Sequence, residues 1–511
     1  MLIKTFGSAV YGIKATTITI EVNASQGINF FLVGLADNAV KESQQRIESA
    51  LQTYGYRMPG KKVVINMAPA DIRKEGSAYD LPLAIGILAA SEQMQSTGLE
   101  RCIIMGELSL DGAIQPVKGA LPIALQAKNE GFTTCIFPKQ NAREAAVVDG
   151  IEVYGANSIK EVIGFFDGKE GLERISVDID AEFLQKHEYE ADFVDVKGQE
   201  NVKRAMEIAA AGGHNIILIG PPGAGKTMLS KRLPGILPPL TLEEALETTK
   251  IHSVAGKTGK DAALITRRPF RSPHHTISDV ALVGGGSFPQ PGEISLAHNG
   301  VLFLDELPEF KRTVLEVMRQ PLEDRVITIS RARFAVEYPA SFMLVASMNP
   351  CPCGFYNHPE KKCVCAPGFV QKYLSRISGP LLDRIDIHIE VVPVPFDKLS
   401  EQRASEPSRV IRERVILARN VQKERYAEYR GIHCNAQMNS KMLRKYCTID
   451  AAGQTIMKNA MQKLGLSARA YDRILKVSRT IADMEASPAI QVHHLAEAIQ
   501  YRSLDREGWG A

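Results

Sequence analysis

A glycine-rich segment in the middle of the chain constrains the fold more than any other feature. Residues 220–227 read Gly-Pro-Pro-Gly-Ala-Gly-Lys-Thr, which fits the phosphate-binding pattern GxxxxGK[ST]. The apolar run 215–219 precedes it directly and is typical of a buried parallel strand. Backbone N–H groups of such a loop can surround a triphosphate at the start of a helix, where the helix dipole also favours negative charge. The segment therefore predicts an α/β core that binds a nucleotide.

A second apolar run ends in two carboxylates. Residues 301–306 read Val-Leu-Phe-Leu-Asp-Glu, so Asp305 closes a buried strand and Glu306 follows it. We expect Asp305 and the Thr227 hydroxyl to hold Mg²⁺, Lys226 to reach the β- and γ-phosphates, and Glu306 to activate the attacking water. The two runs together predict an ATP or GTP site. The predicted nucleotide-binding residues are Gly220, Pro221, Pro222, Gly223, Ala224, Gly225, Lys226, Thr227 and Asp305.

The bulk composition limits the class and location of the protein. Of 511 residues, 45% are hydrophobic and 23% charged, which is ordinary for a globular chain of about three domains. A formal net charge of +3 predicts no general affinity for nucleic acid, so any DNA contact needs a local basic feature. No stretch reaches the ~18 apolar residues of a membrane span, and the first residues lack a signal-peptide core. We expect a cytoplasmic protein without membrane contact.

The chain divides into three parts by its patterns. Residues 1–175 alternate strand-like and helical runs and predict an α/β domain with its own core; 176–195 is acidic and predicts a linker. Residues 196–396 carry the strand–loop–helix pattern of the nucleotide site, and 397–511 are mainly helical. In the first part, strands are expected at 16–22, 63–67, 102–105 and 135–137, and helices at 39–54 and 81–90.

Two further segments complete a known motor layout. The buried strand 342–348 ends in Asn349, which can sense the γ-phosphate or position water, although a strand-ending Asn before proline is also common. Residues 378–386 read Ser-Gly-Pro-Leu-Leu-Asp-Arg-Ile-Asp, and here the sequence resembles the magnesium-chelatase-like branch of the AAA+ ATPases. The resemblance implies that Arg384 is an arginine finger for the ATP of a neighbouring subunit, worth about 10³–10⁵ in rate, and hence a hexameric ring. The alternative is a surface Asp–Arg pair.

The C-terminal segment contains an amphipathic helix that begins near residue 467. Its predicted buried face comprises residues 466, 470, 474, 477 and 481, with Ser467 as the N-cap. Arg469 resembles the second sensor arginine of AAA+ helical lids, and Arg473 is the local alternative. Upstream, Gly198 and Gln199 resemble the segment that flanks the nucleotide base.

Two insertions in the core predict contacts with a substrate. Residues 325–338 read as two short strands that meet near 330–333, and the resemblance implies a hairpin that points into the ring pore. Arg331 and Arg333 would then bind the DNA backbone through sixfold repetition, unless this is an ordinary surface hairpin. The Gly/Pro-rich insertion 271–293 contains His274 and His275, which we expect to be structural or to contact the substrate rather than to bind metal.

Four cysteines cluster directly after Asn349. Cys351, Cys353, Cys363 and Cys365 predict a closed structural Zn²⁺ site. An iron–sulfur cluster and free or redox thiols remain as alternatives. The other cysteines are scattered and suit reduced thiols.

Residues 74–84, 106–112 and 116–119 resemble the Lon protease (S5-like) domain, which raises the question of peptidase activity. The position of the Lon serine is Ala78 here, with Ser77 one residue early. The position of the partner lysine is Leu121, with Lys118 three residues away. Because a serine nucleophile needs a base within hydrogen-bonding reach, we expect a degenerate domain that guides substrate or assembly and is not a peptidase.

Taken together, the motifs identify the chain as a member of the YifB/ComM family of magnesium-chelatase-like AAA+ proteins. The expected fold is α/β multidomain, with a Lon-like, ChlI-type N-terminal domain, an AAA+ core and a C-terminal helical lid. The resemblance implies an ATP- and Mg²⁺-dependent hexameric helicase that drives branch migration of single-stranded or branched DNA in natural transformation or recombination. The alternatives are a magnesium-chelatase motor subunit and an ATP-dependent protein-remodelling scaffold.

Overall fold

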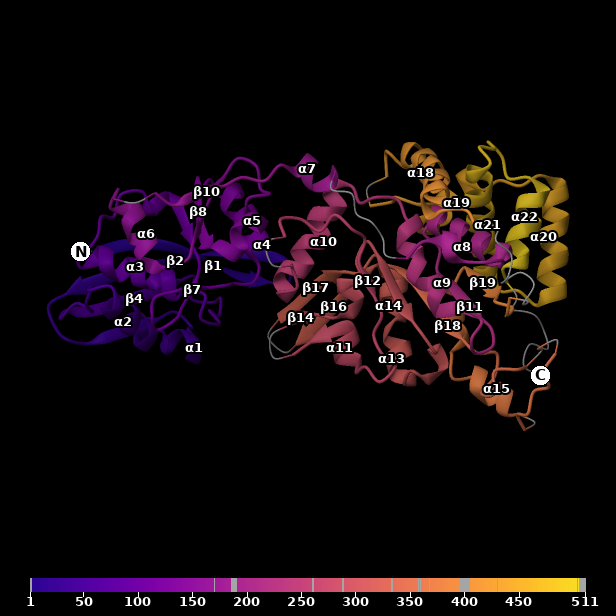
Figure 1. Cartoon of the computed structure of the whole chain (residues 1–511), viewed down its shortest axis with the longest axis horizontal. Helices are drawn as coiled ribbons and strands as arrows, with labels where there is room; N and C mark the ends of the chain where they lie inside the picture. The colour runs from indigo at the N-terminus through magenta and orange to yellow at the C-terminus, as the bar shows by residue number, and fades with distance from the viewer. Residues whose placement is uncertain are drawn as a thin grey trace.

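A computed structural model shows an N-terminal α/β domain, a central core and a C-terminal group of helices (Figure 1). The structure describes residues 2–169, 171–184, 191–259, 262–286, 289–331, 334–356, 358, 360–366, 368–394, 405–429, 431–502 and 504. Within these ranges, no helix combines the length and apolar character that a membrane span requires.

An eight-stranded sheet forms the centre of the N-terminal domain, with the order β10-β9-β8-β5-β1-β2-β4-β3. Its middle is the long antiparallel pair of β1 and β2, whose alternate side chains are buried. The helix α3 (Asp80–Ala90) is buried on every side, because it is apolar all round. The strands are β1 (Leu2–Tyr11), β2 (Lys14–Ser25), β3 (Phe30–Val33), β4 (Lys62–Ala68), β5 (Cys102–Ile104), β8 (Thr134–Pro138), β9 (Glu152–Ala156) and β10 (Glu173–Ile175).

The predicted strands of this domain are confirmed as β2, β4, β5 and β8, and the second predicted helix as α3. The first predicted helix is two helices, α1 (Asn38–Lys41) and α2 (Ser43–Thr53), separated by Glu42. The sequence analysis missed β1, which lies at the middle of the sheet. The remaining helices of the domain are α4 (Ala120–Asn129), α5 (Lys139–Ala145) and α6 (Ile159–Phe166), and α7 (Ile179–Leu184) lies in the predicted linker.

The core is built on a five-stranded parallel sheet with the order β12-β15-β18-β11-β19. Alternate residues of β11, β15 and β18 pack into different apolar clusters on the two faces, because both faces are covered. One cluster includes α8 and the C-terminal helices, and the other includes α13 and the hairpin β16–β17. The strands are β11 (Ile216–Ile219), β12 (Phe270–Arg271), β15 (Val301–Leu304), β18 (Met343–Met348) and β19 (Ile387–Glu390).

The predicted hairpin is present as the antiparallel pair β16 (Val326–Arg331) and β17 (Phe334–Pro339). The longer core helices are α8 (Glu200–Gly212), α9 (Lys226–Arg232), α10 (Leu242–Ala255), α13 (Arg312–Val317), α14 (Arg319–Asp324) and α15 (Phe369–Leu374). Short elements of the core are α11 (Asp279–Val283), α12 (Glu293–Leu296), α16 (Gly379–Leu382), β13 (Gly284–Gly285) and β14 (Gln290–Pro291). The short strands β6 (Glu107–Leu108) and β7 (Ile114–Gln115) pair in the N-terminal domain.

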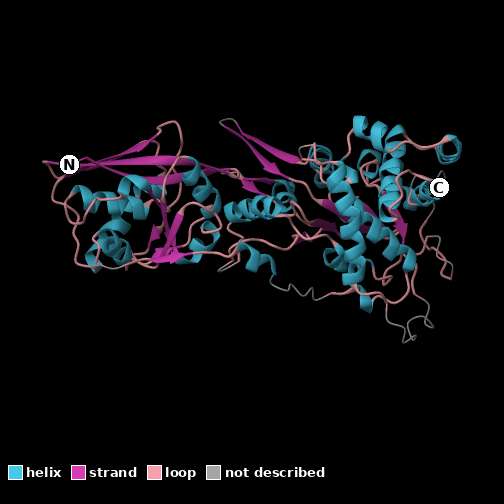
Figure 2. Ribbon diagram, turned by 90° about the horizontal axis from the view of Figure 1, so that it is seen from above, coloured by secondary structure: helices cyan, strands magenta, loops and turns pink. Residues whose placement is uncertain are grey.

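The C-terminal helices are gathered at the end of the molecule opposite the N-terminal domain (Figure 2). The helix α21 begins as predicted, since the Ser467 hydroxyl accepts a hydrogen bond from Ala470 N at 3.2 Å. The predicted buried face is also confirmed, at Leu466, Ala470, Ile474, Val477 and Ile481. The helices are α18 (Ser408–Arg425), α19 (Ser440–Tyr446), α20 (Ala451–Leu464), α21 (Ala468–Met484) and α22 (Val492–Gln500).

The N-terminal domain contacts the core at α10 through a buried carboxylate. Glu144 accepts hydrogen bonds from Leu121 N (2.9 Å) within its own domain and from Thr258 Oγ1 (3.1 Å) and the Ser253 hydroxyl of the core. The turn between β1 and β2 also meets the hairpin, because a Cβ at Gly12 would lie 2.6 Å from Val336 Cγ1. The domain therefore touches both α10 and the hairpin.

Candidate nucleotide site

The carboxyl ends of the parallel strands bring the predicted phosphate-site residues together. Lys226 begins α9, and its Nζ donates to Asn349 Oδ1 at 3.0 Å and to the carbonyl oxygens of Gly220 (2.7 Å) and Pro221 (2.9 Å). Burial lowers the pKa of the Lys226 amine. Two residues 123 positions apart in sequence thus meet at the loop, as expected for neighbouring parallel strands.

The Thr227 hydroxyl and Asp305 also meet there. Thr227 Oγ1 donates to Asp305 Oδ2 at 2.6 Å, and the Ser347 hydroxyl donates to Asp305 Oδ1. Hydroxyl and carboxylate oxygens are the ligands that Mg²⁺ prefers, so these groups fit the predicted ion. The sequence analysis missed Ser347, although it lies two residues before Asn349 and therefore faces the same side of β18.

Glu306 lies at the mouth of this cleft in a left-handed backbone conformation, with φ of 55°. Its carboxylate is exposed, and its Oε2 lies 3.7 Å from His275 Nδ1. The His275 ring stacks on His274 with centroids 4.1 Å apart. The insertion 271–293 therefore reaches the nucleotide site, and the predicted structural or substrate-contacting role of its histidines stays a prediction.

A cleft of about 440 Å³ opens between these residues. A volume of this order suits the phosphates of a nucleotide and leaves Lys226 and Glu306 on its walls. Gln199 lies behind the loop, where its Nε2 donates to Ala224 O (2.9 Å) and Val392 O (3.1 Å). The cleft is lined by Pro222, Gly223, Ala224, Gly225, Lys226, Thr227, Met228, Asp305, Glu306, Ser347, Met348 and Asn349.

Arg384 lies just before β19, at the amino-terminal ends of the parallel strands. The cleft lies at their carboxyl ends, on the opposite side of the sheet. It is only 8% exposed, and its guanidinium donates to Pro380 O (2.7 Å) and to the Glu323 carboxylate. Asn215 Nδ2 holds the Arg384 carbonyl at 2.9 Å. The side chain therefore does not enter the cleft of its own chain and is not the exposed Asp–Arg pair of the alternative hypothesis.

The two candidate sensor arginines of α21 pair with the aspartates that flank Arg384. Arg469 is exposed, and its Nη1 lies 3.7 Å from Asp383 Oδ2, whereas Arg473 Nη1 lies 2.9 Å from Asp386 Oδ1. Although burial alone would raise the pKa of Asp386, the Arg473 guanidinium and His214 hold it well below its usual range. These contacts attach α21 to the segment that carries Arg384.

The four clustered cysteines lie beside the phosphate loop. Their Sγ atoms are all within 4.8 Å of one another, with separations of 3.3 Å (Cys351–Cys353), 3.6 Å (Cys353–Cys363) and 3.8 Å (Cys351–Cys363). Tetrahedral Zn–S bonds of about 2.3 Å place sulfur atoms about 3.8 Å apart, so the four thiolates fit zinc.

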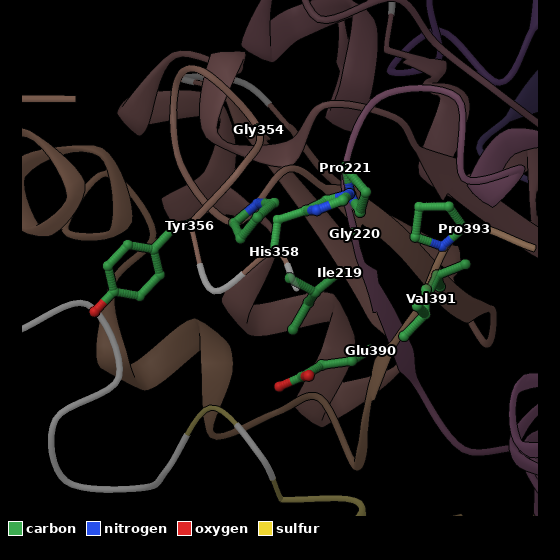
Figure 3. Close-up of a pocket in the computed structure, with 11 residues that line it drawn as sticks. Ile219, Gly220, Pro221, Gly354, Tyr356, His358, Glu390, Val391 and Pro393 are labelled. Atoms are coloured by element: carbon green, nitrogen blue, oxygen red, sulfur yellow. The ribbon is translucent and has the colours of Figure 1, made fainter. Parts of the chain in front are cut away.

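The same segment packs directly against the phosphate loop. A Cβ at Gly354 would lie 2.4 Å from Pro222 Cδ. A small pocket of about 70 Å³ separates the cysteine segment from the residues after β19 (Figure 3). Gly220 and Pro221 of the loop, Tyr356 and His358 of the cysteine segment, and Glu390 to Pro393 form its walls.

The predicted DNA contacts are not described. Arg333 lies outside the described residues, and so does the side chain of Arg331, of which only the backbone in β16 is described. Both remain predictions.

The positions that match the Lon dyad are used for other contacts. Leu121 is fully buried in α4, and its N–H donates to Glu144. Lys118 is exposed next to Gly256, and Ala78 O accepts a hydrogen bond from Gly106 N at 2.9 Å. Among the described residues, no hydrogen bond joins Ser77 to a lysine.

Comparisons with known proteins cover almost the whole chain. Three family models match: "Magnesium chelatase, subunit ChlI" at residues 192–399, "Subunit ChlI of Mg-chelatase" at 20–141, and "Magnesium chelatase, subunit ChlI C-terminal" at 405–502. The N-terminal region is also similar to Lon protease 2 of Bacillus subtilis, with 31% identity over 159 residues, which is 28% of this chain and 27% of that protein.

Two relatives align over nearly their full length. The uncharacterized protein YifB of Salmonella typhimurium is 45% identical over 501 residues, covering 98% of this chain and 96% of the relative. The competence protein ComM of Haemophilus influenzae is 44% identical over 506 residues, covering 98% and 97%. Magnesium-chelatase-like AAA+ membership implies ATPase activity with ATP and Mg²⁺. The chain belongs to the YifB/ComM family of magnesium-chelatase-like AAA+ proteins.

Proposed function

We propose that this protein is an ATP-driven hexameric ring motor that acts on DNA and drives branch migration during transformation or recombination. One observation carries the proposal: the residues expected to bind phosphate, Mg²⁺ and water line a single open cleft. A motor needs such a cleft, because hydrolysis depends on positioning and charge stabilisation rather than on covalent chemistry by the protein.

Each residue has a role in this proposal. Lys226 leaves its contact with Asn349 to bind the γ-phosphate, and Asn349 then senses that phosphate or orients water. The oxygen atoms of Thr227 and Asp305 would hold Mg²⁺, and the ion would neutralise charge on the phosphates. Glu306, exposed at the mouth of the cleft, takes the proton of the attacking water.

The position of Arg384 supports assembly into a ring. Arg384 lies at the amino-terminal ends of the strands and the cleft at their carboxyl ends. Arg384 would therefore contact the nucleotide of another copy and not that of its own chain. It would first have to leave Glu323, and its Nε, which has no hydrogen-bond partner among the described residues, is available for a new bond. Arg469, as second sensor, is attached to the same segment through Asp383.

The hairpin and the relatives support DNA as the substrate. The antiparallel pair of β16 and β17 supports the predicted hairpin, and the predicted basic residues Arg331 and Arg333, repeated sixfold, would bind a phosphate backbone. One full-length relative is a competence protein, which supports a role in transformation. The alternative of a magnesium-chelatase subunit has less support, since the 38 kDa chelatase subunit of Cereibacter sphaeroides matches only 31% of this chain at 23% identity.

We propose the following units: an inactive Lon-like domain at 1–175, a linker at 176–195, the motor core at 196–396 and a helical lid at 397–511. The contacts of Glu144 with α10, and of Gly12 with the hairpin, support an assembly or guiding role for the first unit.

We further propose that Cys351, Cys353, Cys363 and Cys365 bind structural zinc. Their sulfur separations fit a tetrahedral ion, and the contact of Gly354 with Pro222 places the metal segment against the phosphate loop. The metal content of the purified protein, measured by inductively coupled plasma emission spectroscopy, tests this proposal. Zinc is expected, whereas iron or metal-free protein would contradict it.

The experiment that tests the motor is ATP hydrolysis with no DNA, with single-stranded DNA and with a four-way junction, alongside displacement of a labelled strand. Stimulation together with strand displacement is the expected result. Hydrolysis that is indifferent to every DNA, without displacement, would overturn the proposal and favour a protein-remodelling scaffold. Arg331→Ala with Arg333→Ala should abolish the stimulation and leave basal turnover and ring formation intact.

A further inference from the structure

A third cavity lies at the amino-terminal ends of the core strands, away from the nucleotide cleft. Its volume is about 80 Å³. Gly300 and Phe342 on its wall directly precede β15 and β18, and Gly213 ends the turn before β11. The other wall comes from the C-terminal helical segment, through Arg419 on α18 and Cys434. The cavity therefore lies between the core and the C-terminal helices.

Three arginines line this cavity, and only one of them is neutralised. Arg268 makes bidentate hydrogen bonds to Glu244, with Nη2–Oε2 at 3.0 Å and Nη1–Oε1 at 3.2 Å, and donates to Asn299 O at 2.7 Å. The charge of Arg268 is therefore balanced, and all of its nitrogens have partners.

Arg325 and Arg419 lack such partners. Arg325 follows α14 in a left-handed conformation (φ of 59°), and its backbone bonds to Pro321 and Ala340. Its guanidinium makes no hydrogen bond or ion pair with the described part of the chain. Arg419 makes only long bonds, to Ala210 O (3.2 and 3.4 Å) and His433 O (3.4 Å), and pairs with no carboxylate of the described residues.

Two acids act on these arginines, and both are already engaged. Glu244 on the cavity wall attracts Arg419 but is held by Arg268. Asp386 is already engaged by Arg473 at 2.9 Å and by the backbone N–H of Asn215 at 3.0 Å. Burial lowers the pKa of the Arg325 guanidinium, as expected for a partly buried charge that has no ion-pair partner among the described residues. Such a charge is costly unless an anion joins it.

We propose that this cavity binds a phosphate group between Arg325 and Arg419. Planar guanidinium groups bind phosphate oxygens through paired, charge-assisted hydrogen bonds, which suits two arginines facing one small cavity. The small volume and the two arginines suit orthophosphate or the terminal phosphate of a nucleotide. This site is separate from Lys226 and does not depend on the proposed motor activity.

The test uses the full-length chain with Lys226→Ala, which removes phosphate binding at the loop. Orthophosphate is titrated calorimetrically against chloride at constant ionic strength. Saturable binding is expected, and adding Arg325→Gln and Arg419→Gln should weaken it about tenfold or more, because each lost charge-assisted bond contributes strongly. Arg409→Gln is the matched control, since Arg409 lies on the same helix α18 with its side chain 75% exposed.

A second measurement tests whether a ligand occupies the cavity, without changing its arginines. Cys434 is buried on the cavity wall, and its alkylation, followed by peptide mass spectrometry in the Lys226→Ala chain, should slow when orthophosphate is added. ADP in place of orthophosphate distinguishes the sources: protection by ADP assigns a nucleotide phosphate, and protection by orthophosphate alone assigns the free ion. Absence of protection by both ligands, or equal binding after both arginine changes, would overturn the proposal.

Discussion

The two α/β domains of this chain use their polar side chains in opposite ways. In the N-terminal domain, the loop that resembles a protease site is held by Arg46, whose Nε donates to the buried Asp80 at 2.6 Å. In the core, Lys226, Asp305 and Asn349 line an open cleft. Polar groups are paired in both regions, but the pair of Arg46 and Asp80 fixes the fold, whereas the paired groups of the core line an accessible cleft where a ligand can replace their contacts.

The largest effect that tests this contrast is expected from Glu306→Gln. We expect ATP hydrolysis to fall about 10²–10⁴-fold, because the amide cannot accept the proton of water, while nucleotide binding persists. Turnover and binding of a labelled ATP analogue are the measurements. Glu309→Gln is the control, since its carboxylate pairs with Arg376 at 3.1 Å. Normal turnover in Glu306→Gln would show that another group activates water.

A structural effect is expected from Arg46→Ala in the N-terminal domain. This change leaves the buried Asp80 carboxylate without its partner and should cost about 3–5 kcal/mol of the domain's stability. Urea unfolding followed by hydrogen exchange of β1 and β2 measures the loss. ATP turnover should persist in this variant as long as the core stays folded. A variant that is as stable as the wild type but hydrolyses no ATP would show that Arg46 has more than a structural role.

The interface between the domains should depend on pH through Glu144. Burial raises the pKa of this carboxyl group, so its protonated form is favoured in the docked state. Stabilisation is therefore complete below the ordinary pKa of a glutamate and is lost as pH rises through the raised value. Protection factors of the α10 amides, corrected for the intrinsic pH dependence of hydrogen exchange, should be larger at acidic pH across about pH 4 to 8.

Glu144→Gln should remove that dependence, because glutamine keeps an acceptor for Leu121 N–H and Ser253 and does not ionise. Glu130→Gln at an exposed site of the same domain is the matched control. An unchanged pH profile in Glu144→Gln would assign the dependence to another group.

The smallest expected effect is that of Ser77→Ala. This residue has no described base within hydrogen-bonding reach, so stability should change by less than about 0.5 kcal/mol and ATP turnover should be unaffected. Casein cleavage, measured with and without ATP, should be absent in both proteins. Cleavage that disappears with Ser77→Ala would restore the peptidase hypothesis.

Much of the core could be predicted because its signals are local. The loop pattern at 220–227 and the apolar runs before Asp305 and Asn349 fixed the strands, and parallel pairing then brought Lys226 and Asn349 together. The amphipathic helix α21 likewise followed from its period and its N-cap.

The rest depends on contacts between distant residues. The burial of Arg384 arises from Glu323 and Asn215, and the role of Glu144 arises from Thr258, none of which carries a local pattern. The central strand β1 was missed because its residues mix polar and apolar types, and burial is set by its pairing with β2.

In a parallel sheet all carboxyl ends of the strands lie on one side and all amino ends on the other. Here the cleft lies at the carboxyl ends and Arg384 at the amino ends. A copy that offers its arginine side to the cleft of the next copy uses two different surfaces, so the contact is head-to-tail. Repeated contacts of this kind either close into a ring or continue as a filament. Under the proposed role of Arg384, the last cleft of any open row lacks an arginine and the first arginine lacks a cleft, so only closure would give every copy a complete site.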